Sequence, residues 1–392
     1  MNIKELAEAY KDYIIERRHY YHSHPELTLQ EVNTAKSIME DLKDIGVDEI
    51  IPFQNGWHGC VGIINGAKPG KTVLLRADID ALPVAEETGL SYASEKIGVM
   101  HACGHDTHIV MLLGAAKILQ TIKGEFSGRV KLLFQPAEEL GVGAKEAIRQ
   151  GFLDDVDACY GVHINPSVTT RKFNFESGAR MASGDQIDIT IEGFSAHGSA
   201  PHLGHDAIVA AGAVISGIQA IVSRFNNPLD PLVITLGTIH GGHRFNIIPG
   251  KVLIDGTSRY FNPKLIKEVE ENLKLVVENI SNAYGCKGTV EFMHVMDPLS
   301  NSDVHLVDLA RAAVVKLYGK ESLEKLEKST GGEDFSYYMK KVPGVFGFVG
   351  TNNPNIPNSQ LSLHHECFTI DEDVFAGGAA VAAQFAVDFL NE

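Results

Sequence analysis

The stretch Met100–His108, with the sequence MHACGHDTH, places a thiol, three imidazoles and a carboxylate within nine residues. Cys103 and His105 are two positions apart, so in an extended segment their side chains point to the same side. A thiolate and an imidazole that converge on one point are good ligands for a transition-metal ion. The alternative is a helix start that is rich in histidine and carries a small buried cysteine. This stretch alone leaves both interpretations open.

Two adjacent carboxylates, Glu138 and Glu139, follow the apolar stretch 128–134 and Pro136. Neighbouring carboxylates repel each other, and placing both beneath a cleft is costly without a cation. Adjacent side chains also project in different directions. One carboxylate can therefore bind a metal while the other accepts a proton from a metal-activated water. The alternative is a solvated acidic turn.

Two later histidines complete the candidate set, His163 in the segment 158–164 and His364 in the segment 362–366. Together with Cys103, His105 and Glu139 they form a mixed sulfur, nitrogen and oxygen set, which suits Zn²⁺, Mn²⁺, Ni²⁺ or Co²⁺ better than Ca²⁺ or Mg²⁺. Five ligands exceed the needs of one tetrahedral ion with an open position, so two ions with a shared bridging group are more economical. The chain has 17 histidines, so any single one can instead be an ordinary hydrogen-bonded residue.

Short apolar segments alternate with helical patterns over most of the chain. This alternation predicts a largely parallel or mixed sheet covered by helices, with ligands gathered beyond the strand ends. Asp78 and Asp80 also fall at such a strand end. The predicted strands are 59–64, 71–77, 128–134, 158–164 and 345–349, and the predicted helices are two within 3–47, one from 109, and 143–151, 303–318, 335–341 and 375–390.

The pattern changes between residues 181 and 293, where six elements follow in the order strand, helix, strand, strand, helix, strand. That order is typical of a ferredoxin-like α+β unit. We therefore expect an α/β domain with a mixed sheet, formed by 1–180 and 294–392, and an inserted ferredoxin-like domain over 181–293. The six predicted elements are 185–192, 205–224, 232–240, 251–260, 262–284 and 287–296.

Composition restricts the partners of this chain. It has 392 residues, with 34 Lys and Arg against 50 Asp and Glu, for a formal charge of −16. Such a surface repels phosphate backbones and anionic lipids, so we expect no nucleic acid and no membrane partner. We also see no apolar run long enough to span a bilayer. Five scattered cysteines predict a reducing, cytoplasmic setting.

Several motifs in series resemble the M20 metallopeptidase family, and most closely its amidohydrolase branch of N-acyl-amino-acid amidohydrolases, hippurate hydrolases and auxin-conjugate hydrolases. The resemblance implies a mixed-sheet metallohydrolase domain with an inserted lid domain. The motifs of the main domain are LRADIDALP (75–83), MHACGHDTH (100–108), FQPAEE (134–139), YGVHI (160–164) and SLHHECF (362–368). Those of the lid are GFSAHGSAPHLGHDAI (193–208), FNIIPG (245–250) and GTSRY (256–260).

The resemblance implies a role for each matching residue in the main domain. Glu138 matches the general base, and Asp78 matches an acid thought to orient a metal-binding imidazole, which is a reasonable supporting role. Asp80 is expected to be a structural partner of nearby backbone or of Arg76, and Asp106 a helix cap. The residues that match the ligands of two divalent ions are Cys103, His105, Glu139, His163 and His364, with the Cys103 thiolate as the bridge.

In the lid, His197 matches a histidine that reaches the active site of a partner subunit and steadies the oxyanion. Asn246 and Arg259 match residues expected to hold the substrate, and the forked guanidinium of Arg259 suits a carboxylate. The family also implies a homodimer or tetramer that assembles through the lid.

The chain departs from the family pattern at two positions. His364 is followed by His365 and Glu366 rather than by a small polar residue and proline, so His365 stays an alternative last ligand. Tyr260 stands where a small residue is common, which predicts a different substrate pocket. The segment 331–335, GGEDF, resembles one that lines the cleft of family members.

These expectations lead to a metal-dependent hydrolase that cleaves the amide of N-acyl amino acids, with Mn, Zn, Ni or Co as the metal. A carboxypeptidase or dipeptidase with the same chemistry is the nearby alternative, and an N-acetyl-diaminopimelate deacetylase is another. The alternative from a different class is a metal-binding protein without catalysis. It would have no need for a general base beside the five ligands.

Overall fold

The computed structural model describes residues 2–392, and the chain forms two compact units. The first unit contains the residues up to Gly178, Ser300–Glu327 and Asp334–Glu392. The second contains Ala179–Leu299 and the short segment Lys328–Glu333, and this segment lies outside the range 181–293 expected for the inserted domain. Two short strands, β7 and β12, pair where the chain passes between the units. They span Gly178–Met181 and Leu299–Asn301.

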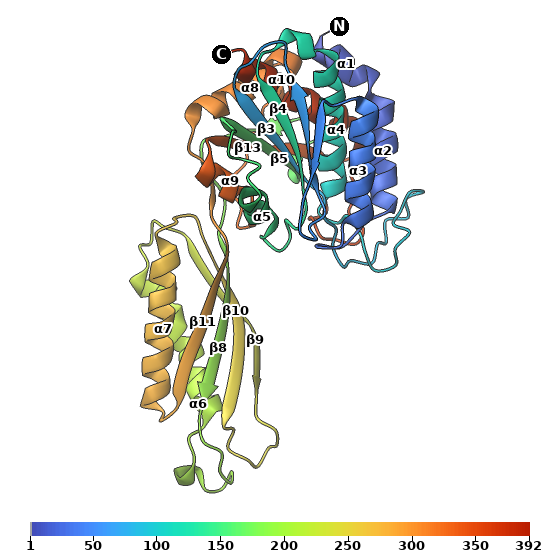
Figure 1. Cartoon of the computed structure of the whole chain (residues 1–392). Coiled ribbons are helices and arrows are strands. Elements are labelled where there is room, and N and C mark those ends of the chain that lie inside the picture. The colour runs from blue at the N-terminus through green and yellow to red at the C-terminus, as the bar shows by residue number, and fades with distance from the viewer. Residues whose placement is uncertain (1) are drawn as a thin grey trace. The chain divides into compact units, whose positions relative to one another are not determined.

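The first unit is built on a seven-stranded mixed sheet in the order β1-β2-β4-β3-β5-β13-β6 (Figure 1). Strand β3 is parallel to β4 and β5, and β13 is parallel to β5, whereas β2 is antiparallel to β1 and β4 and β6 is antiparallel to β13. The prediction of a mixed sheet covered by helices is confirmed. The strands are Glu49–Pro52, Cys60–Asn65, Thr72–Asp78, Arg129–Gln135, Ala158–Thr169, Phe173–Asn174 and Gly344–Asn352 for β1 to β6 and β13.

The central strands of this sheet explain where the polar residues gather. Every residue of β3 is buried, as expected for a strand that is covered on both faces. Asp78 at its end lies opposite Gln135 at the end of the parallel strand β4. The segments that follow both strands therefore leave the sheet at the same edge, which is where ligands bind in such sheets.

Helices pack on the sheet, and two of them, α4 and α10, are almost completely buried. Ala379 on α10 and Ile14 on α2 lie so close to Gly114 on α4 that a side chain at Gly114 would clash with both. The segment Glu372–Leu390, which contains α10, is apolar enough to cross a membrane by length and composition, contrary to our expectation, but 78% of it is buried in the protein. It is a core helix. The helices are Ile3–Ala9, Lys11–Ser23, Val32–Ile45, His105–Thr121, Gly143–Arg149, Val304–Tyr318, Ser336–Lys341 and Phe375–Leu390 for α1 to α5 and α8 to α10.

The second unit is a four-stranded antiparallel sheet in the order β11-β8-β10-β9, with two helices on one face (Figure 1). This order, with the connections of the chain, is that of a ferredoxin-like fold. Its core joins isoleucines of β8 to apolar side chains of both helices. The elements are β8 Gly184–Glu192, α6 Ala207–Ala220, β9 Leu232–Gly241, β10 Lys251–Tyr260, α7 Leu265–Ala283 and β11 Lys287–Met296.

One side of this second unit exposes apolar side chains to solvent. Strand β9 is an edge strand, and α6, which packs over β8, β9 and β10, continues as one π-helical turn, Ile221–Phe225. The segment Ala207–Phe225 is also apolar enough to cross a membrane by length and composition, and only 28% of it is buried in the chain. Its exposed apolar surface therefore needs an explanation.

Candidate metal centre

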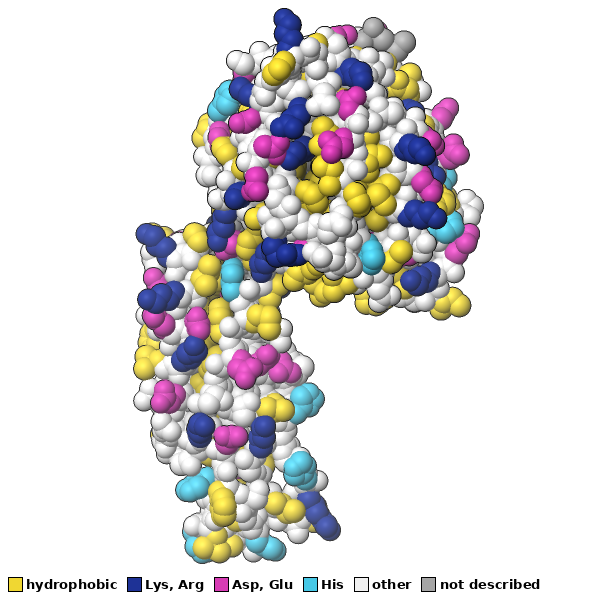
Figure 2. All heavy atoms as spheres, in the orientation of Figure 1, with side chains coloured by type: hydrophobic (Ala, Val, Ile, Leu, Met, Phe, Trp, Pro, Cys, Tyr) yellow, Lys and Arg dark blue, Asp and Glu magenta, His cyan; other side chains and the backbone are white. Residues whose placement is uncertain are grey.

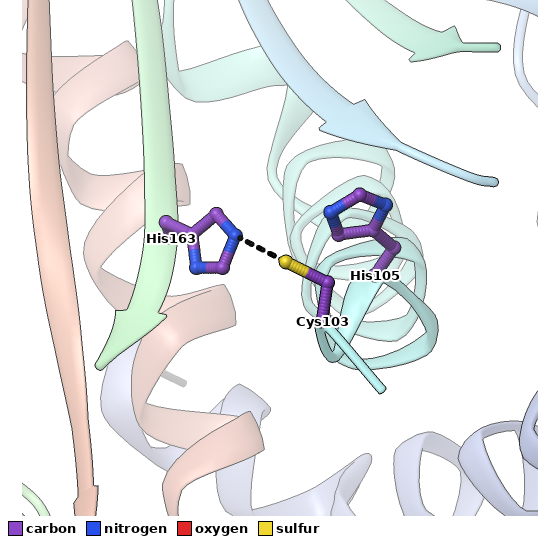
Figure 3. A group of neighbouring side chains, drawn as sticks. All are labelled: Cys103, His105 and His163. Carbon is purple, nitrogen blue, oxygen red and sulfur yellow. Dashed lines mark hydrogen bonds between the residues drawn. The ribbon is translucent and has the colours of Figure 1, made fainter. Parts of the chain in front are cut away.

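The loop before α4 delivers the thiol and the first imidazole of the candidate centre. Gly104 has φ +81°, and a Cβ atom there would lie 2.4 Å from the side chain of Ile164, so both conformation and packing require glycine. The turn at Gly104 places Cys103 just before α4 and His105 in its first position. Figure 3 shows the sulfur of Cys103 directed at His163, which comes from β5, with the ring of His105 nearby.

The five predicted ligands, which come from four separate segments, converge in the first unit. The Sγ atom of Cys103 lies 3.4 Å from Nε2 of His163 and 3.3 Å from Nε2 of His364. Oε1 of Glu139 lies 3.6 Å from Nε2 of His364 and 3.9 Å from Nε2 of His105. These contacts place a thiol, three imidazoles and a carboxylate around one point.

The ligand atoms form two overlapping groups, each of which could hold one ion. Cys103, His105 and His163 make the first group, and Cys103, Glu139 and His364 make the second, with the ligand atoms of each group within 4.8 Å of one another. Nε2 of His105 and Oε1 of Glu139 are buried and have no hydrogen-bond partner among the described residues. Buried polar atoms that lack a partner are costly. The donor set therefore fits two cations, one for each group, and Cys103 belongs to both groups.

Burial sets the protonation of these groups. Burial and then the charge of Glu139 raise the pKa of the Cys103 thiol well above its usual value. Burial and the neighbouring His108 lower the pKa of His163. His163 is thus held neutral, which is the form that binds metals. Cys103 needs a cation to become a thiolate.

Two non-glycine residues in this region have left-handed backbone conformations. Ala137, directly before Glu138, has φ +58°, and His364 has φ +69°. Such conformations cost free energy for residues with a Cβ atom and cluster at functional sites. The one at Ala137 turns the chain so that Glu138 and Glu139 both face the group of ligands. The one at His364 directs its ring toward Cys103.

Glu138 sits next to the ligands and is 6% exposed. Its carboxylate lies within 4.8 Å of the ligand atoms of His105 and Glu139. Its Oε1 atom also accepts a hydrogen bond from the backbone N–H of Asp334, at 3.4 Å. A carboxylate at this position, held by the backbone and adjacent to the cation site, can accept a proton from a water there.

Asp78 and Asp80, the two acids at the end of β3, each contact a different histidine, and this pairing differs from our expectation. The Nδ1 atom of His105 contacts the Oδ1 atom of Asp80 at 3.2 Å and its backbone oxygen at 3.0 Å. Asp78 instead contacts Nδ1 of His108 at 2.5 Å and lies 3.7 Å from Nε2 of His105. Asp80, rather than Asp78, therefore orients the ring of His105.

Arg76 makes its ion pairs with Asp78, at 2.5 Å, and Asp334, at 2.9 Å. Of the two partners expected for Asp80, nearby backbone or Arg76, the structure shows nearby backbone, the N–H of Glu139. Asp80 accepts hydrogen bonds from the hydroxyl of Thr28 at 2.8 Å and from the backbone N–H of Glu139 at 3.1 Å. It thus links the ring of His105 to the segment that carries Glu139.

A buried ion pair that the sequence did not indicate supports the start of α4. Asp106 does not cap the helix, because the N-cap residue is Gly104. Asp106 instead pairs with Arg18 at 3.0 Å and with His22 at 2.8 Å, and all three side chains are at most 1% exposed. Arg18 and His22 lie on α2, far away in the sequence, and show no motif of their own.

The second unit places His197 and Asn246 together but Arg259 elsewhere. His197 pairs in an isolated β-bridge with Ile247, and the N–H of Gly198 donates to the carbonyl of Asn246. Arg259 lies near the opposite end of β10, eight residues beyond Lys251. At about 3.3 Å per residue this separates the two places by about 26 Å. A single copy of this unit cannot bring all three residues to one substrate.

Gly184 leaves room for the side chain of Arg259. Its Nη1 atom donates to the carbonyl of Ser183 at 3.2 Å and lies 2.6 Å from where a Cβ atom of Gly184 would be. The neighbouring Tyr260 is 0% exposed, and its hydroxyl donates to Asp185 inside the core of the unit. Tyr260 is therefore a core residue of this unit, and its effect on a substrate pocket stays a prediction.

The last ligand position shows a clear difference between two adjacent histidines. His364 faces Cys103 and Glu139, as described above. His365 contacts the carboxylate of Glu366 at 3.6 Å and accepts a hydrogen bond from the backbone N–H of Cys367. The geometry therefore favours His364 as the candidate ligand.

A family model described as peptidase family M20/M25/M40 matches residues 74–388. The chain belongs to this family. The predicted resemblance is thus confirmed, and the match includes every candidate ligand together with Glu138.

Individual relatives of this M20 chain agree with the family match. The N-acetyl-L-cysteine deacetylase of Bacillus subtilis is 40% identical over 371 residues, which cover 95% of this chain and 86% of the relative. Thermostable carboxypeptidase 1 of Saccharolobus solfataricus is 38% identical over 397 residues, which cover 100% and 98%. Among solved structures, a Bacillus subtilis protein described as a dinuclear metal binding peptidase from the M20 family superposes with a TM-score of 0.85 and is 33% identical. That match covers 98% of this chain and 99% of the other.

Proposed function

We propose that this protein is a metal-dependent amidohydrolase that cleaves N-acyl amino acids into a carboxylic acid and a free amino acid. The observation that carries the proposal is the pair of ligand groups that share Cys103, with Glu138 beside them. The name of the B. subtilis relative, an N-acetyl-L-cysteine deacetylase, supports an N-acyl amino acid as the substrate.

The residues would divide the reaction among them. Two divalent ions of Mn, Zn, Ni or Co, when bound, polarise the amide carbonyl and lower the pKa of a water. The carboxylate of Glu138 accepts the proton of that water and then donates it to the departing nitrogen. The ring of His105, oriented by Asp80, and the carboxylate of Glu139 hold the ion site, together with Cys103, His163 and His364.

The second unit would supply the recognition of the substrate. Arg259 offers a forked, permanently charged donor for the carboxylate of the amino acid. Asn246 has a buried side-chain oxygen without a hydrogen-bond partner in the described part of the chain. Together with His197 it would face the acyl carbonyl, where His197 would stabilise the oxyanion.

The position of these residues supports a homodimer that assembles through the second unit. A second copy could bring its His197 and Asn246 to a substrate bound by Arg259, which one copy cannot do. The edge strand β9 and α6, which packs against it, expose apolar side chains that a second copy could cover, with Ile208, Val209 and Val233 each between 43% and 52% exposed. Figure 2 shows apolar and histidine side chains exposed together at one end of this unit.

A carboxypeptidase is the second candidate, because one close relative carries that name. The chemistry at the metal centre would be the same, and only the leaving group would be larger. We further propose that the protein acts in the cytoplasm, since its five cysteines are all free and four of them are buried.

A substrate panel tests the proposal directly. The metal-free protein is reloaded with Mn²⁺, Zn²⁺, Ni²⁺ or Co²⁺ and incubated with N-acetyl amino acids, hippurate and dipeptides. We expect hydrolysis of N-acyl amino acids with at least one metal. Preference for dipeptides would favour the carboxypeptidase, and bound metal without hydrolysis of any amide would favour a metal-binding protein without catalysis.

A further inference from the structure

The loop that carries Glu138 and Glu139 runs from Gln135, the last residue of β4, to Ala144 near the start of α5. The carboxylate of Asp334 holds both ends of this loop. The side-chain amide of Gln135 donates to Oδ1 at 2.9 Å and to Oδ2 at 2.8 Å. The backbone N–H of Ala144 donates to Oδ2 at 2.9 Å. One carboxylate therefore fixes where the loop begins and where it ends.

Asp334 also contacts the middle of the same loop. Its backbone N–H donates to Oε1 of Glu138 at 3.4 Å. The side chain of Asp334 is fully buried, so these contacts are made away from solvent, where hydrogen bonds to a charged group contribute most. A single residue thus touches the loop at its start, at its functional carboxylate and at its end.

The loop has little freedom to absorb a shift of Asp334. The N–H groups of Val142 and Gly143 both donate to the carbonyl of Ala137, which closes the loop on itself. A Cβ atom at Gly143 would lie 1.7 Å from the carbonyl oxygen of Pro136. In such a tightly packed loop, a change at either end moves the segment that carries Glu138.

Asp334 is itself held in place by Arg76. The guanidinium donates to Asp334 at 2.9 Å, to Asp78 at 2.5 Å and to the side-chain oxygen of Gln135 at 2.9 Å. The hydroxyl of Tyr338 donates to that same oxygen of Gln135 at 2.8 Å. The charge of Asp334 is thereby compensated, and the position of its carboxylate is set from two sides.

We infer that Asp334 is a positioning residue that sets where the carboxylate of Glu138 lies relative to the ion site. The inference rests on the proposed role of Glu138 as the general base. Asp334 acts through the loop and through its backbone N–H, and its carboxylate lies within 4.8 Å of the carboxylates of Glu138 and Glu333. The GGEDF segment, expected from the resemblance to line the cleft, thus contributes a buried anchor at its fourth residue.

The test is the variant Asp334→Asn, which keeps the size of the side chain but replaces one acceptor oxygen by an amide. That amide would face Gln135, Ala144 or Arg76, all of which donate. We expect kcat for an N-acetyl amino acid to fall about 10- to 100-fold, because sub-ångström placement of a catalytic group has effects of this size. KM should change less than about threefold and the bound metal should stay at the wild-type level, since the ligands are not altered.

Two further variants make the result specific. Asp371→Asn is the matched control, because Asp371 is a buried carboxylate that accepts hydrogen bonds from Thr170 and Asn353. The Asp371→Asn variant should be less stable than the wild-type protein but have the same kcat. If Asp334→Asn does not fold, Gln135→Met removes the other partner of the same contact, and kcat is measured in that variant instead.

The double variant Glu138→Gln with Asp334→Asn separates this inference from the proposed function. If Asp334 acts through Glu138, Asp334→Asn should cause no further loss of kcat when Glu138 is already replaced. An equal loss in both backgrounds, or an unchanged kcat in a folded, metal-loaded Asp334→Asn protein, overturns the inference. Wild-type activity in Glu138→Gln instead overturns the role of Glu138 as the general base, and no hydrolysis of any amide by the metal-loaded wild-type protein overturns the proposed function.

Discussion

The contact between Asp80 and His105 gives a quantitative prediction for Asp80→Asn. One carboxylate oxygen of Asp80 accepts hydrogen bonds from the hydroxyl of Thr28 and from the backbone N–H of Glu139, and the other oxygen contacts Nδ1 of His105. We expect the single oxygen of asparagine to turn toward Thr28 and Glu139, because a buried backbone N–H without an acceptor costs about 1–3 kcal/mol. The amide nitrogen then faces Nδ1 of His105, which keeps only the backbone oxygen of residue 80, at 3.0 Å.

The expected loss is therefore mainly in metal binding. Removal of the partner that orients a metal-binding histidine typically lowers affinity about 10- to 100-fold, which corresponds to about 1.4–2.8 kcal/mol. The free energy of unfolding of the metal-free protein should fall by about 1–3 kcal/mol. Titration of the metal-free protein with Co²⁺ measures the first quantity, and urea unfolding measures the second.

A matched control for this variant is Asp41→Asn. Asp41 is also buried and accepts hydrogen bonds from Tyr21 and Arg17, but it lies on α3 away from the ligands. The Asp41→Asn variant should have a lower free energy of unfolding and an unchanged Co²⁺ affinity. Equal Co²⁺ affinity in folded Asp80→Asn and in the wild-type protein would refute the role that we assign to Asp80.

Three more predictions concern the second unit. Arg259→Ala should raise KM for substrates with a free carboxylate at least tenfold, by loss of a charge-assisted contact; an equal rise for carboxamide analogues would contradict this role. Burial lowers the pKa of His294, but hydrogen bonds to Asp185 and Asp297 outweigh it and raise that pKa to about 9. Its contribution to stability, on the order of 3 kcal/mol, should be complete below about pH 6.5 and disappear as the pH rises through about 9. His294→Gln should remove that part of the pH dependence in thermal unfolding, and an unchanged profile would exclude this source. Val233→Lys on the edge strand should convert a dimer to monomers in sedimentation. Leu275→Lys on α7, at a position that is also exposed, should not. A dimer that persists in Val233→Lys would locate the interface elsewhere.

The sequence predicted the elements of both units well because their apolar patterns are strong. The buried strand β3 and the order of six elements in the second unit both follow from periodicity that tertiary contacts reinforce. The structure also brings together Cys103, His105, Glu139, His163 and His364, whose residue types already pointed to a metal. Metal-ligating side chains are informative in sequence because few other environments favour a buried thiol beside imidazoles and carboxylates.

Pairings between buried charges could not be predicted from the sequence. Asp78 and Asp80 are alike in type and both end the same strand, and only the packing of His105 and Arg76 decides which acid contacts which base. Arg18 reaches Asp106 from a helix that is distant in the chain. Asp334 lies almost 200 residues beyond Glu138. Such contacts depend on side-chain positions in the folded core, for which neither periodicity nor spacing gives a signal.

The central claim is that Glu138 carries the proton in a metal-dependent cleavage of an amide. The most direct test is kcat of Glu138→Gln for an N-acetyl amino acid, measured on protein whose metal content is determined in the same sample. We expect kcat to fall at least about 10²- to 10⁴-fold while the bound metal stays at the wild-type level, because glutamine keeps the shape of the side chain but cannot accept the proton. Wild-type kcat in a folded, metal-loaded Glu138→Gln protein would contradict the claim.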